Sequence, residues 1–428
     1  MKYLLAPLLA LSLVGCSLFD GPVVSEIEPS GTPSPIASPA DLLVFGGFDP
    51  RYRGLLSESF VKLIYQGYQL SLDEVHGEVA GMRVGLVPAI PDALADRLLG
   101  EGGYGEVQDL TEAVIAYAEN EPRFVADMGP NHWRARDDGS IRALCQAGIV
   151  MISSTLADPS ASASGCPTQR LFRTAGSVGS SGRAAAQYFQ DTGVKRVLLL
   201  TSRADSDRQL PVWKAQLSAF TAAARAVGVQ IVDQRDLIKT TASQIRSLNP
   251  EAVFFIGLSD RVEAAALWKL RSEVAAIPFM INDMSLTDDF DLIGRQYSPE
   301  GPMLLSTFAF EPSSYIGYQD FLQRWDSRFG EEIRFGDVGI AMDSYAAMKA
   351  LLTAIEQVAS SGIRDPREIA ARLPGVLASL KLSGAPYGEP WGFTGSGDRY
   401  PVIGGIYTVD LTLSEDLYLF PLRAVRYE

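Results

Sequence analysis

Apolar runs long enough for buried strands alternate with helical stretches along almost the whole chain. The strand-like runs lie at residues 41–48, 82–90, 123–129, 150–154, 195–202, 229–234, 252–258, 277–283 and 301–310. The helical patterns lie at residues 59–75, 107–120, 182–193, 213–228, 261–274, 318–330, 339–362 and 365–376. Continuous apolar strands separated by helices indicate parallel sheets covered on both faces. A second series begins past residue 170, and the Gly-rich tail returns to β character, so the sequence predicts an α/β protein with two doubly wound, Rossmann-like lobes.

The N-terminus has the pattern of an export signal. Lys2 precedes an apolar run from residue 4 to residue 13, which is too short to span a bilayer. The sequence Leu-Val-Gly-Cys that follows resembles the bacterial lipobox, in which Cys16 becomes the lipidated first residue of the mature chain. The alternative is an ordinary signal peptide with an accidental cysteine. We therefore expect a signal peptide at residues 1–15 and a lipidated Cys16 followed by a Pro/Ser-rich tether to residue 40.

These features predict an extracytoplasmic protein of a bacterial cell envelope, attached to the membrane by its lipid only. No later apolar run approaches the length that a membrane-spanning helix needs. The formal net charge of −14 argues against nucleic acid as a partner, because nucleic-acid binding requires a basic surface.

Cys145 and Cys166 are an even pair in an exported chain. In an oxidising compartment such a pair is a candidate disulfide, and two buried free thiols are the alternative. A bridge would join a helix end to a loop on the other side of the apolar strand at residues 150–154.

Catalytic motifs are missing from the sequence. The chain contains no G-x-S-x-G, no H-E-x-x-H and no phosphate-binding loop of the G-x-x-x-x-G-K-[ST] type. Neither histidine stands in a metal-spaced cluster. We therefore expect a protein that is not an enzyme and that has no cofactor and no metal site.

Six stretches in order resemble one family, the type I periplasmic solute-binding proteins of the leucine/isoleucine/valine-binding kind. They are residues 67–87, 151–160, 170–189, 279–285, 334–348 and 392–400. The resemblance implies two lobes joined by three crossovers, with a small solute held between them and passed to the permease subunits of an ABC transporter. Lobe 1 would comprise residues 41–170 and 310–378, and lobe 2 residues 171–304 and 379–428.

The resemblance also implies the two ends of an amino-acid site. Ser153, Ser154 and Thr155 leave a strand where the family binds the solute's carboxylate with hydroxyls and backbone N–H groups. The alternative is that they cap the next helix and bind nothing. Asp283 stands where the family has the acid that pairs with the ammonium group, and its alternative is a loop cap.

Other positions depart from the family. Where the family has a serine after its G-P turn, this chain has Asn131 followed by His132, Trp133 and Arg134. Trp133 would form an apolar wall or part of the core, while Arg208 would bind a carboxylate or remain a surface residue. We therefore predict an amino acid or related carboxylate as the solute, with acidic or polar solutes favoured over leucine. The alternative function is a ligand-free scaffold of the same fold that regulates an envelope enzyme such as a peptidoglycan synthase.

Overall fold

The chain divides into two compact units in the computed structural model. The model describes residues 40–47, 58–90, 107–131, 139–157, 161, 166, 169–202, 211–257, 260–282, 285, 288–297, 303–307, 315–331, 333, 335–410 and 418–427. The first unit comprises the described residues within Leu18–Val178, Ala309–Ile403 and Arg426–Glu428, and the second those within Gly179–Phe308 and Gly404–Val425.

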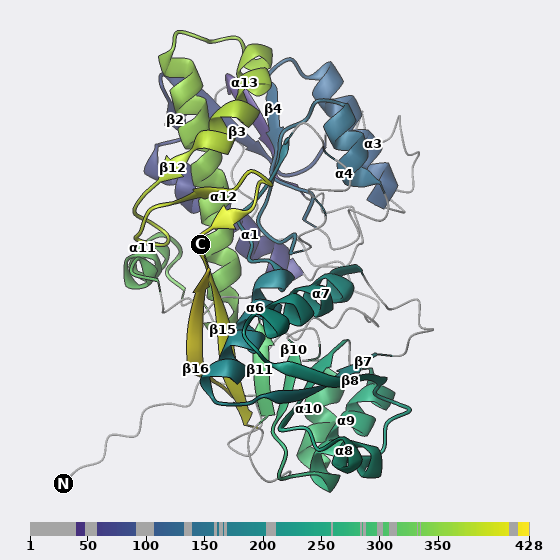
Figure 1. Ribbon diagram of the computed structural model, residues 1–428. Helices are drawn as coiled ribbons and strands as arrows, with labels where there is room; N and C mark the ends of the chain where they lie inside the picture. Colours follow the sequence, from purple (N-terminus) through teal and green to yellow (C-terminus); the bar gives the residue numbers. More distant parts are fainter. Residues whose placement is uncertain are drawn as a thin grey trace, which may run out of the picture. The chain divides into compact units, whose positions relative to one another are not determined.

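A mostly parallel sheet forms the centre of the first unit (Figure 1). Its strands are β1 (Leu42–Phe45), β2 (Glu78–Val79), β3 (Met82–Val87), β4 (Phe124–Asp127), β5 (Met151–Ser153) and β6 (Leu171–Arg173), in the order β2-β3-β1-β4-β5-β6. Only β2 runs antiparallel to its neighbour. The helices are α1 (Glu58–Glu74), α3 (Val107–Asn120), α4 (Ser140–Gln146), α11 (Tyr318–Phe329), α12 (Phe335–Ser360) and α13 (Pro366–Ser379).

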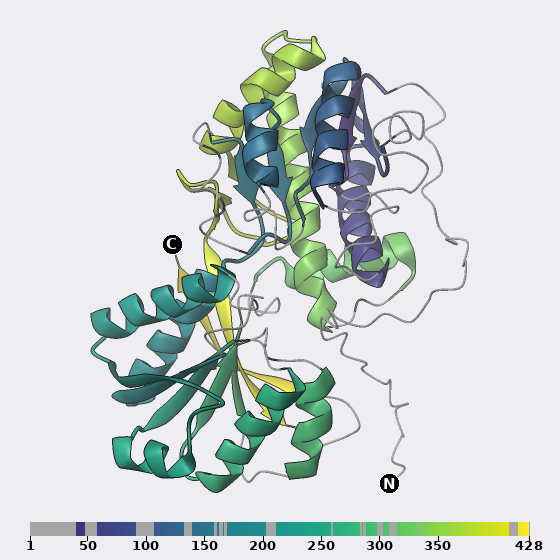
Figure 2. The same ribbon diagram turned by 90° about the vertical axis from the view of Figure 1, so that its right-hand side faces the viewer.

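Alternating side chains of the strands fill two apolar layers, one on each face of this sheet. In β1, Leu42 and Val44 pack in the cluster formed with α1, α12 and α13, whereas Phe45 packs in the cluster formed with α3 and α4. Figure 2 shows the two sets of helices on opposite faces of the sheet. This two-layer burial explains why the strands read as continuous apolar runs.

Helices α1 and α12 lie unusually close together because α1 has a glycine at the point of contact. A Cβ atom on Gly67 would lie 2.7 Å from the Cβ of Ser344 and 2.8 Å from the carbonyl oxygen of Ala341. The close approach brings Tyr68 and Ser344 to the same place beside the sheet, where both contact Ser154.

Part of α12 corrects one expectation from the sequence. Its 23 residues Val338–Ser360 are long and apolar enough to cross a membrane by length and composition, although no such run was expected. Of the most apolar window, 83% is buried against the rest of the protein. This segment is therefore the core helix of the first unit.

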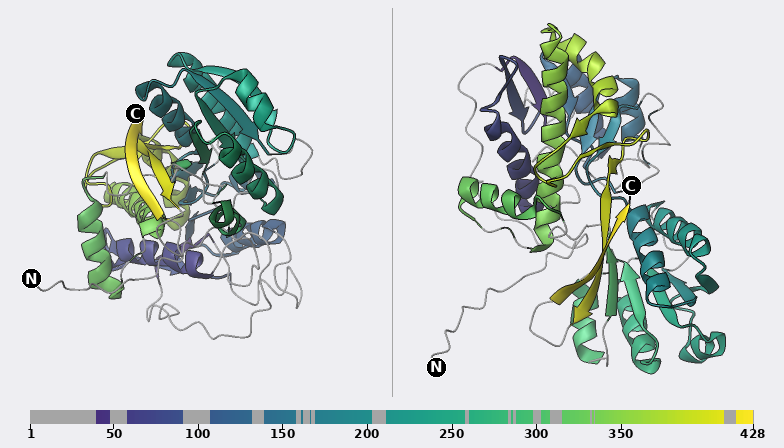
Figure 3. Two further views of the ribbon diagram at one scale, coloured as in Figure 1. Left: turned by 90° about the horizontal axis from the view of Figure 1, so that it is seen from below. Right: turned by 60° about the vertical axis from the view of Figure 1, so that its left-hand side comes forward.

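The second unit contains a larger mixed sheet (Figure 3). Its strands are β7 (Arg196–Thr201), β8 (Gln230–Asp236), β9 (Ala252–Ile256), β10 (Phe279–Asn282), β11 (Met303–Thr307), β15 (Val402–Asp410) and β16 (Tyr418–Tyr427), in the order β16-β15-β11-β10-β9-β7-β8. The helices are α6 (Val178–Asp191), α7 (Pro211–Ala226), α8 (Ala242–Leu248), α9 (Arg261–Glu273) and α10 (Asp288–Tyr297). The strands from β7 to β11 are parallel, and β15 returns antiparallel to β11. The expected fold class, an α/β protein with two doubly wound units, is confirmed.

The sequence placed the whole tail, residues 379–428, in the second lobe. In the structure, the described part of the tail up to residue 403 belongs to the first unit instead. Its first part forms a small antiparallel sheet of β12 (Lys381–Leu382), β13 (Trp391–Phe393) and β14 (Arg399–Tyr400) in the first unit. The physical reason is apolar burial, since Leu382, Trp391 and Phe393 belong to the core cluster of α12 and α13.

Cys145 and Cys166 are joined by a disulfide in the first unit. The bridge links the end of α4 to the segment before β6.

Arg399 binds three segments of the first unit that lie next to places where the chain passes to the second. Its Nε donates to the carbonyl oxygen of Thr174 at 2.7 Å. Its Nη1 donates to the hydroxyl of Tyr315 at 3.0 Å and to the carbonyl oxygen of Pro401 at 2.9 Å. The guanidinium also lies 3.6 Å from the carboxylate of Asp343 and is fully buried. These bonds fix the connecting segments to the first unit.

Candidate functional site

The predicted hydroxyl cluster lies at the carboxyl edge of the first unit's sheet. β4 ends at Asp127 and β5 at Ser153, and the residues that follow each strand meet there. In parallel sheets this edge is where ligands bind, because loops and helix N-termini converge on it.

Ser153 uses its hydroxyl entirely within the protein. The Oγ atom donates toward the carbonyl oxygen of Pro130 at 2.8 Å and the Oδ1 atom of Asn131 at 3.0 Å. It also accepts the backbone N–H of Leu156 at 3.1 Å and that of Thr155 at 3.4 Å. The side chain is fully buried and caps the turn after β5.

Asn131 occupies the point on which the donors of this turn converge. Its Oδ1 atom accepts the hydroxyl of Ser153, the backbone N–H of Ser154 at 3.2 Å and the hydroxyl of Thr155 at 3.2 Å. Its Nδ2 atom donates to the carbonyl oxygen of Met128 at 2.5 Å and to the hydroxyl of Tyr68 at 3.3 Å. Every hydrogen-bonding atom of this amide is therefore used, and the side chain is 1% exposed.

Ser154 is held from the side of the helices. Its Oγ atom accepts a hydrogen bond from Ser344 at 3.1 Å and lies 3.3 Å from the hydroxyl of Tyr68. Burial raises the pKa of Tyr68 well above its ordinary value, so its hydroxyl remains protonated. Of the three predicted hydroxyl residues, only Thr155 is partly exposed. Thr155 is therefore the member of this set that a solute can reach, although its hydroxyl donates to Asn131 in this structure.

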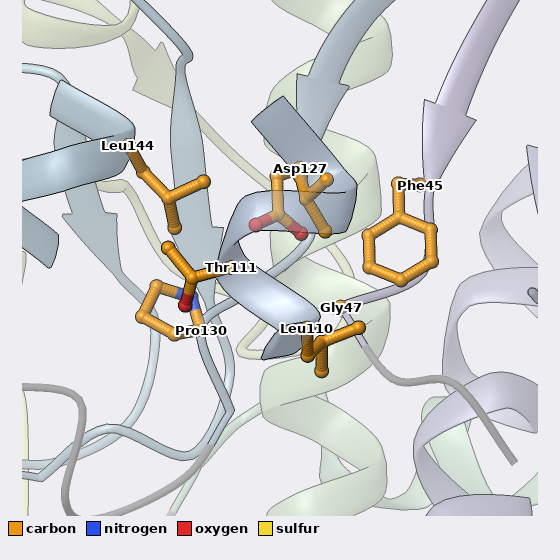
Figure 4. Close-up of a pocket in the computed structure, with 8 residues that line it drawn as sticks. Phe45, Gly47, Leu110, Thr111, Asp127, Pro130 and Leu144 are labelled. Atoms are coloured by element: carbon orange, nitrogen blue, oxygen red, sulfur yellow. The ribbon is translucent and has the colours of Figure 1, made fainter. Parts of the chain in front are cut away.

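A second polar feature of the same edge is the carboxylate of Asp127. It lies on a partly open cavity of about 20 Å³ whose wall is formed by Phe45, Gly47, Leu110, Thr111, Val114, Pro130 and Leu144 (Figure 4). Burial raises the pKa of Asp127 to about 7, although a hydrogen bond from the backbone of Gly129 acts in the opposite direction. Asp127 was not among the residues predicted from the sequence. The signal was available, since Asp127 is the only charged residue in the run from Phe124 to Gly129.

The second unit has a buried polar network at the corresponding edge of its own sheet. Asn282, the last residue of β10, accepts the backbone N–H of Gly257 at 3.2 Å and the hydroxyl of Ser285 at 2.5 Å. Its Nδ2 atom donates to the Oε1 of Gln216 at 3.2 Å. This network fixes the backbone immediately before the predicted Asp283.

Solved structures match this architecture over nearly their whole length. An ABC transporter substrate-binding protein from Desulfitobacterium hafniense, in complex with leucine, has a TM-score of 0.61 and 18% identity, covering 89% of this chain and 99% of its own. This chain has the fold of a type I periplasmic solute-binding protein. A leucine-binding protein from Thermotoga maritima gives a TM-score of 0.59 and 16% identity, with coverages of 90% and 97%. A solute-binding protein of an ABC transporter from Rhodopseudomonas palustris, in complex with p-hydroxybenzoic acid, has a TM-score of 0.60 and 16% identity. This match covers 90% of this chain and 96% of that protein. No protein-family model and no curated protein matches the sequence.

Within this periplasmic-binding-protein fold, the structure brings together Ser153, Ser154 and Thr155, as their adjacency requires, and adds the partners Asn131, Tyr68 and Ser344. The other predicted residues, Trp133, Arg208, Asp283 and Cys16, lie outside the described residues. Their roles in solute binding and lipidation stay predictions.

Proposed function

We propose that this protein is a lipid-anchored, extracytoplasmic solute-binding protein that captures a small carboxylate-bearing solute, such as an amino acid, for an ABC transporter. The observation that carries the proposal is the match of two complete α/β units to substrate-binding proteins over 96% or more of their length. The solutes in two of those structures, leucine and p-hydroxybenzoic acid, both carry a carboxylate.

The polar groups at the carboxyl edges support this solute class. In the first unit, Thr155 is the partly exposed residue of the predicted set, and its hydroxyl would exchange its bond to Asn131 for one to the solute's carboxylate. In the second unit, Asp283 follows directly after the fixed Asn282 and is proposed to pair with the solute's ammonium group. Arg208 is proposed to favour solutes with an additional acidic group, because a guanidinium binds a carboxylate through two parallel hydrogen bonds.

A thermal-shift screen of the mature protein over amino acids, aromatic carboxylates, short peptides and amides tests the proposal. A solute at 100 times its dissociation constant should raise the free energy of unfolding by about 2.7 kcal/mol. The gain produced by an amino acid should disappear in Asp283→Ala, because the ammonium group would then lie without its partner. A gain that persists in Asp283→Ala would retain solute binding and reject the role of Asp283.

Lipid attachment is tested separately by the intact mass of the protein in the membrane fraction. We expect the mass of an acylated chain that begins at Cys16, and no acylated species in Cys16→Ser. An unmodified chain that begins elsewhere would contradict the lipid anchor.

One observation favours a second candidate, a scaffold that regulates an envelope enzyme such as a peptidoglycan synthase. The hydroxyls of Ser153 and Ser154 and the amide of Asn131 satisfy one another, so this part of the edge needs no solute to complete its hydrogen bonds. A flat thermal-shift response together with co-purification of an envelope enzyme would support the scaffold over the transporter component.

A further inference from the structure

The end of β4 carries a carboxylate that the described part of the protein does not neutralise. Asp127 is 2% exposed, and its Oδ1 atom has no hydrogen-bond partner among the described residues. No lysine, arginine or histidine is among the described residues that line its cavity. An ionised carboxylate in such surroundings carries a large desolvation cost unless a cation or a proton compensates its charge.

The wall of the cavity restricts what that cation can be. Phe45, Leu110, Val114 and Leu144 present apolar groups, and Thr111 presents the other polar side chain among the described residues of the wall. Ca²⁺ needs six to eight oxygen ligands, and Mg²⁺ needs an octahedral shell, so this lining does not suit a divalent metal.

The size and the chemistry of the cavity suit an ammonium group. A volume of about 20 Å³ is room for roughly one water molecule, and an –NH₃⁺ group is of similar size. Its N–H donors would form charge-assisted hydrogen bonds with the carboxylate, while the apolar wall would contact the carbon attached to the nitrogen. A proton alone is the competing solution, because at neutral pH about half of the molecules already hold one on Asp127.

We propose that the cavity beside Asp127 binds the ammonium group of a small primary amine, with Asp127 as its counterion. The inference deepens the proposed function and rests on it for the biological ligand, which would be a solute that carries a primary ammonium group. Asp127 in the first unit is then an acceptor additional to the predicted Asp283 of the second unit.

Methylammonium chloride is the probe, because it carries the ammonium group and little else. At about pH 8.5 it should raise the melting temperature of the wild-type protein, whereas sodium chloride and tetramethylammonium chloride at equal concentration should not. The apparent affinity should fall about tenfold at pH 6, because a carboxyl group with a pKa of about 7 is then only ~10% ionised. Asp127→Asn should abolish the effect at both pH values, and the control Asp326→Asn, on the exposed face of α11, should retain it.

A wild-type response to methylammonium that is no larger than the response to sodium chloride at pH 8.5 would overturn the inference, as would an undiminished response in Asp127→Asn. If Asp127→Asn does not fold, the pH dependence of the wild-type protein tests the inference alone. A roughly tenfold loss of affinity for methylammonium between pH 8.5 and pH 6 would support the amine site, and an unchanged affinity would overturn it. The solute panel separates the two proposals: a panel solute that binds while methylammonium does not refutes only the amine site, and a flat panel with a positive methylammonium response refutes only the proposed solute class.

Discussion

The hydroxyl of Ser153 donates a hydrogen bond to the amide oxygen of Asn131 at 3.0 Å. The two residues come from turns after adjacent strands, β5 and β4, and this bond closes the edge of the sheet between them. The hydroxyls of Ser153 and Thr155 and the backbone N–H of Ser154 all donate to this amide oxygen. The side chain of Asn131 thus occupies the place where these three donors converge.

Removing that amide should destabilise the first unit. Asn131→Ala would leave the buried backbone N–H of Ser154 without its acceptor and would remove the bonds that Ser153 and Thr155 donate to the amide, at a cost of about 3 kcal/mol in the free energy of unfolding. Urea denaturation measures the loss. The control Asn120→Ala, whose exposed amide bonds only to the carbonyl of Ala116, should change stability by less than about 0.5 kcal/mol. Equally small losses of stability in both variants would show that the hydrogen bonds to the Asn131 amide contribute little to the free energy of unfolding.

The carboxyl group of Asp127 makes the stability depend on pH. Its pKa in the folded protein is about 7, above the ordinary 3.8, so its favourable contribution is fully present below about pH 4 and is lost as pH rises through 7. Asp127→Asn cannot ionise. The stability of this variant relative to wild type should therefore increase by up to about 1.4 kcal/mol per pH unit between pH 4 and 7 and then level off.

Denaturation curves of the two proteins across this pH range, in buffers free of amines, provide the measurement. A constant difference between them would contradict the raised pKa.

Arg399 should contribute much more to stability than an exposed arginine in a simple ion pair. Arg399→Met would free the carbonyl oxygens of Thr174 and Pro401 and leave Asp343 without its cation, so we expect a loss of about 3–5 kcal/mol. In the control Arg372→Met, the lost pair with Glu368 is exposed, and the loss should stay below about 1 kcal/mol. Similar losses in the two variants would refute the anchoring role of Arg399.

The disulfide should resist thiol reagents until it is reduced. Thiol titration of the unfolded, unreduced protein should find neither Cys145 nor Cys166 free. Because the bridge closes a loop with a sequence separation of 21, replacing both cysteines by alanine should cost about 3 kcal/mol in the chain-entropy model. Two reactive thiols in the titration would rule the bridge out.

Strands that lie in continuous apolar runs were predictable from the sequence, including the three-residue β5, whereas β6, the strands of the small sheet and helices α8 and α10 were not. β6, with three residues, and β12 to β14 are too short to show a period, and β13 includes a glycine. Helix α8 has only seven residues, but its capping box of Thr241 and Gln244 was a readable signal. Helix α10 was also missed, although its apolar residues Phe290 and Ile293 are buried against the second unit.

The candidate site was predictable only in part. The turn at Ser153 could be located because it ends an apolar strand, but its partners could not. Asn131, Tyr68 and Ser344 lie 22, 86 and 190 residues from the serines that they contact. Their meeting depends on the close packing of α1 against α12 at Gly67, which no local pattern encodes. The charge of Asp127 was visible in the sequence, but its burial without a partner was not.

Native mass spectrometry of the ligand-free mature protein, mixed in turn with each solute of the carboxylate panel, tests the central claim most directly. At about 1 mM solute, a complex with a binding free energy of only −4 kcal/mol is half formed, so weak binding is also seen. The account predicts one solute bound per chain for at least one amino acid or related carboxylate, and a smaller bound fraction with the matched amide, which lacks the carboxylate. Spectra that show only the unliganded chain with every solute in the panel would contradict it.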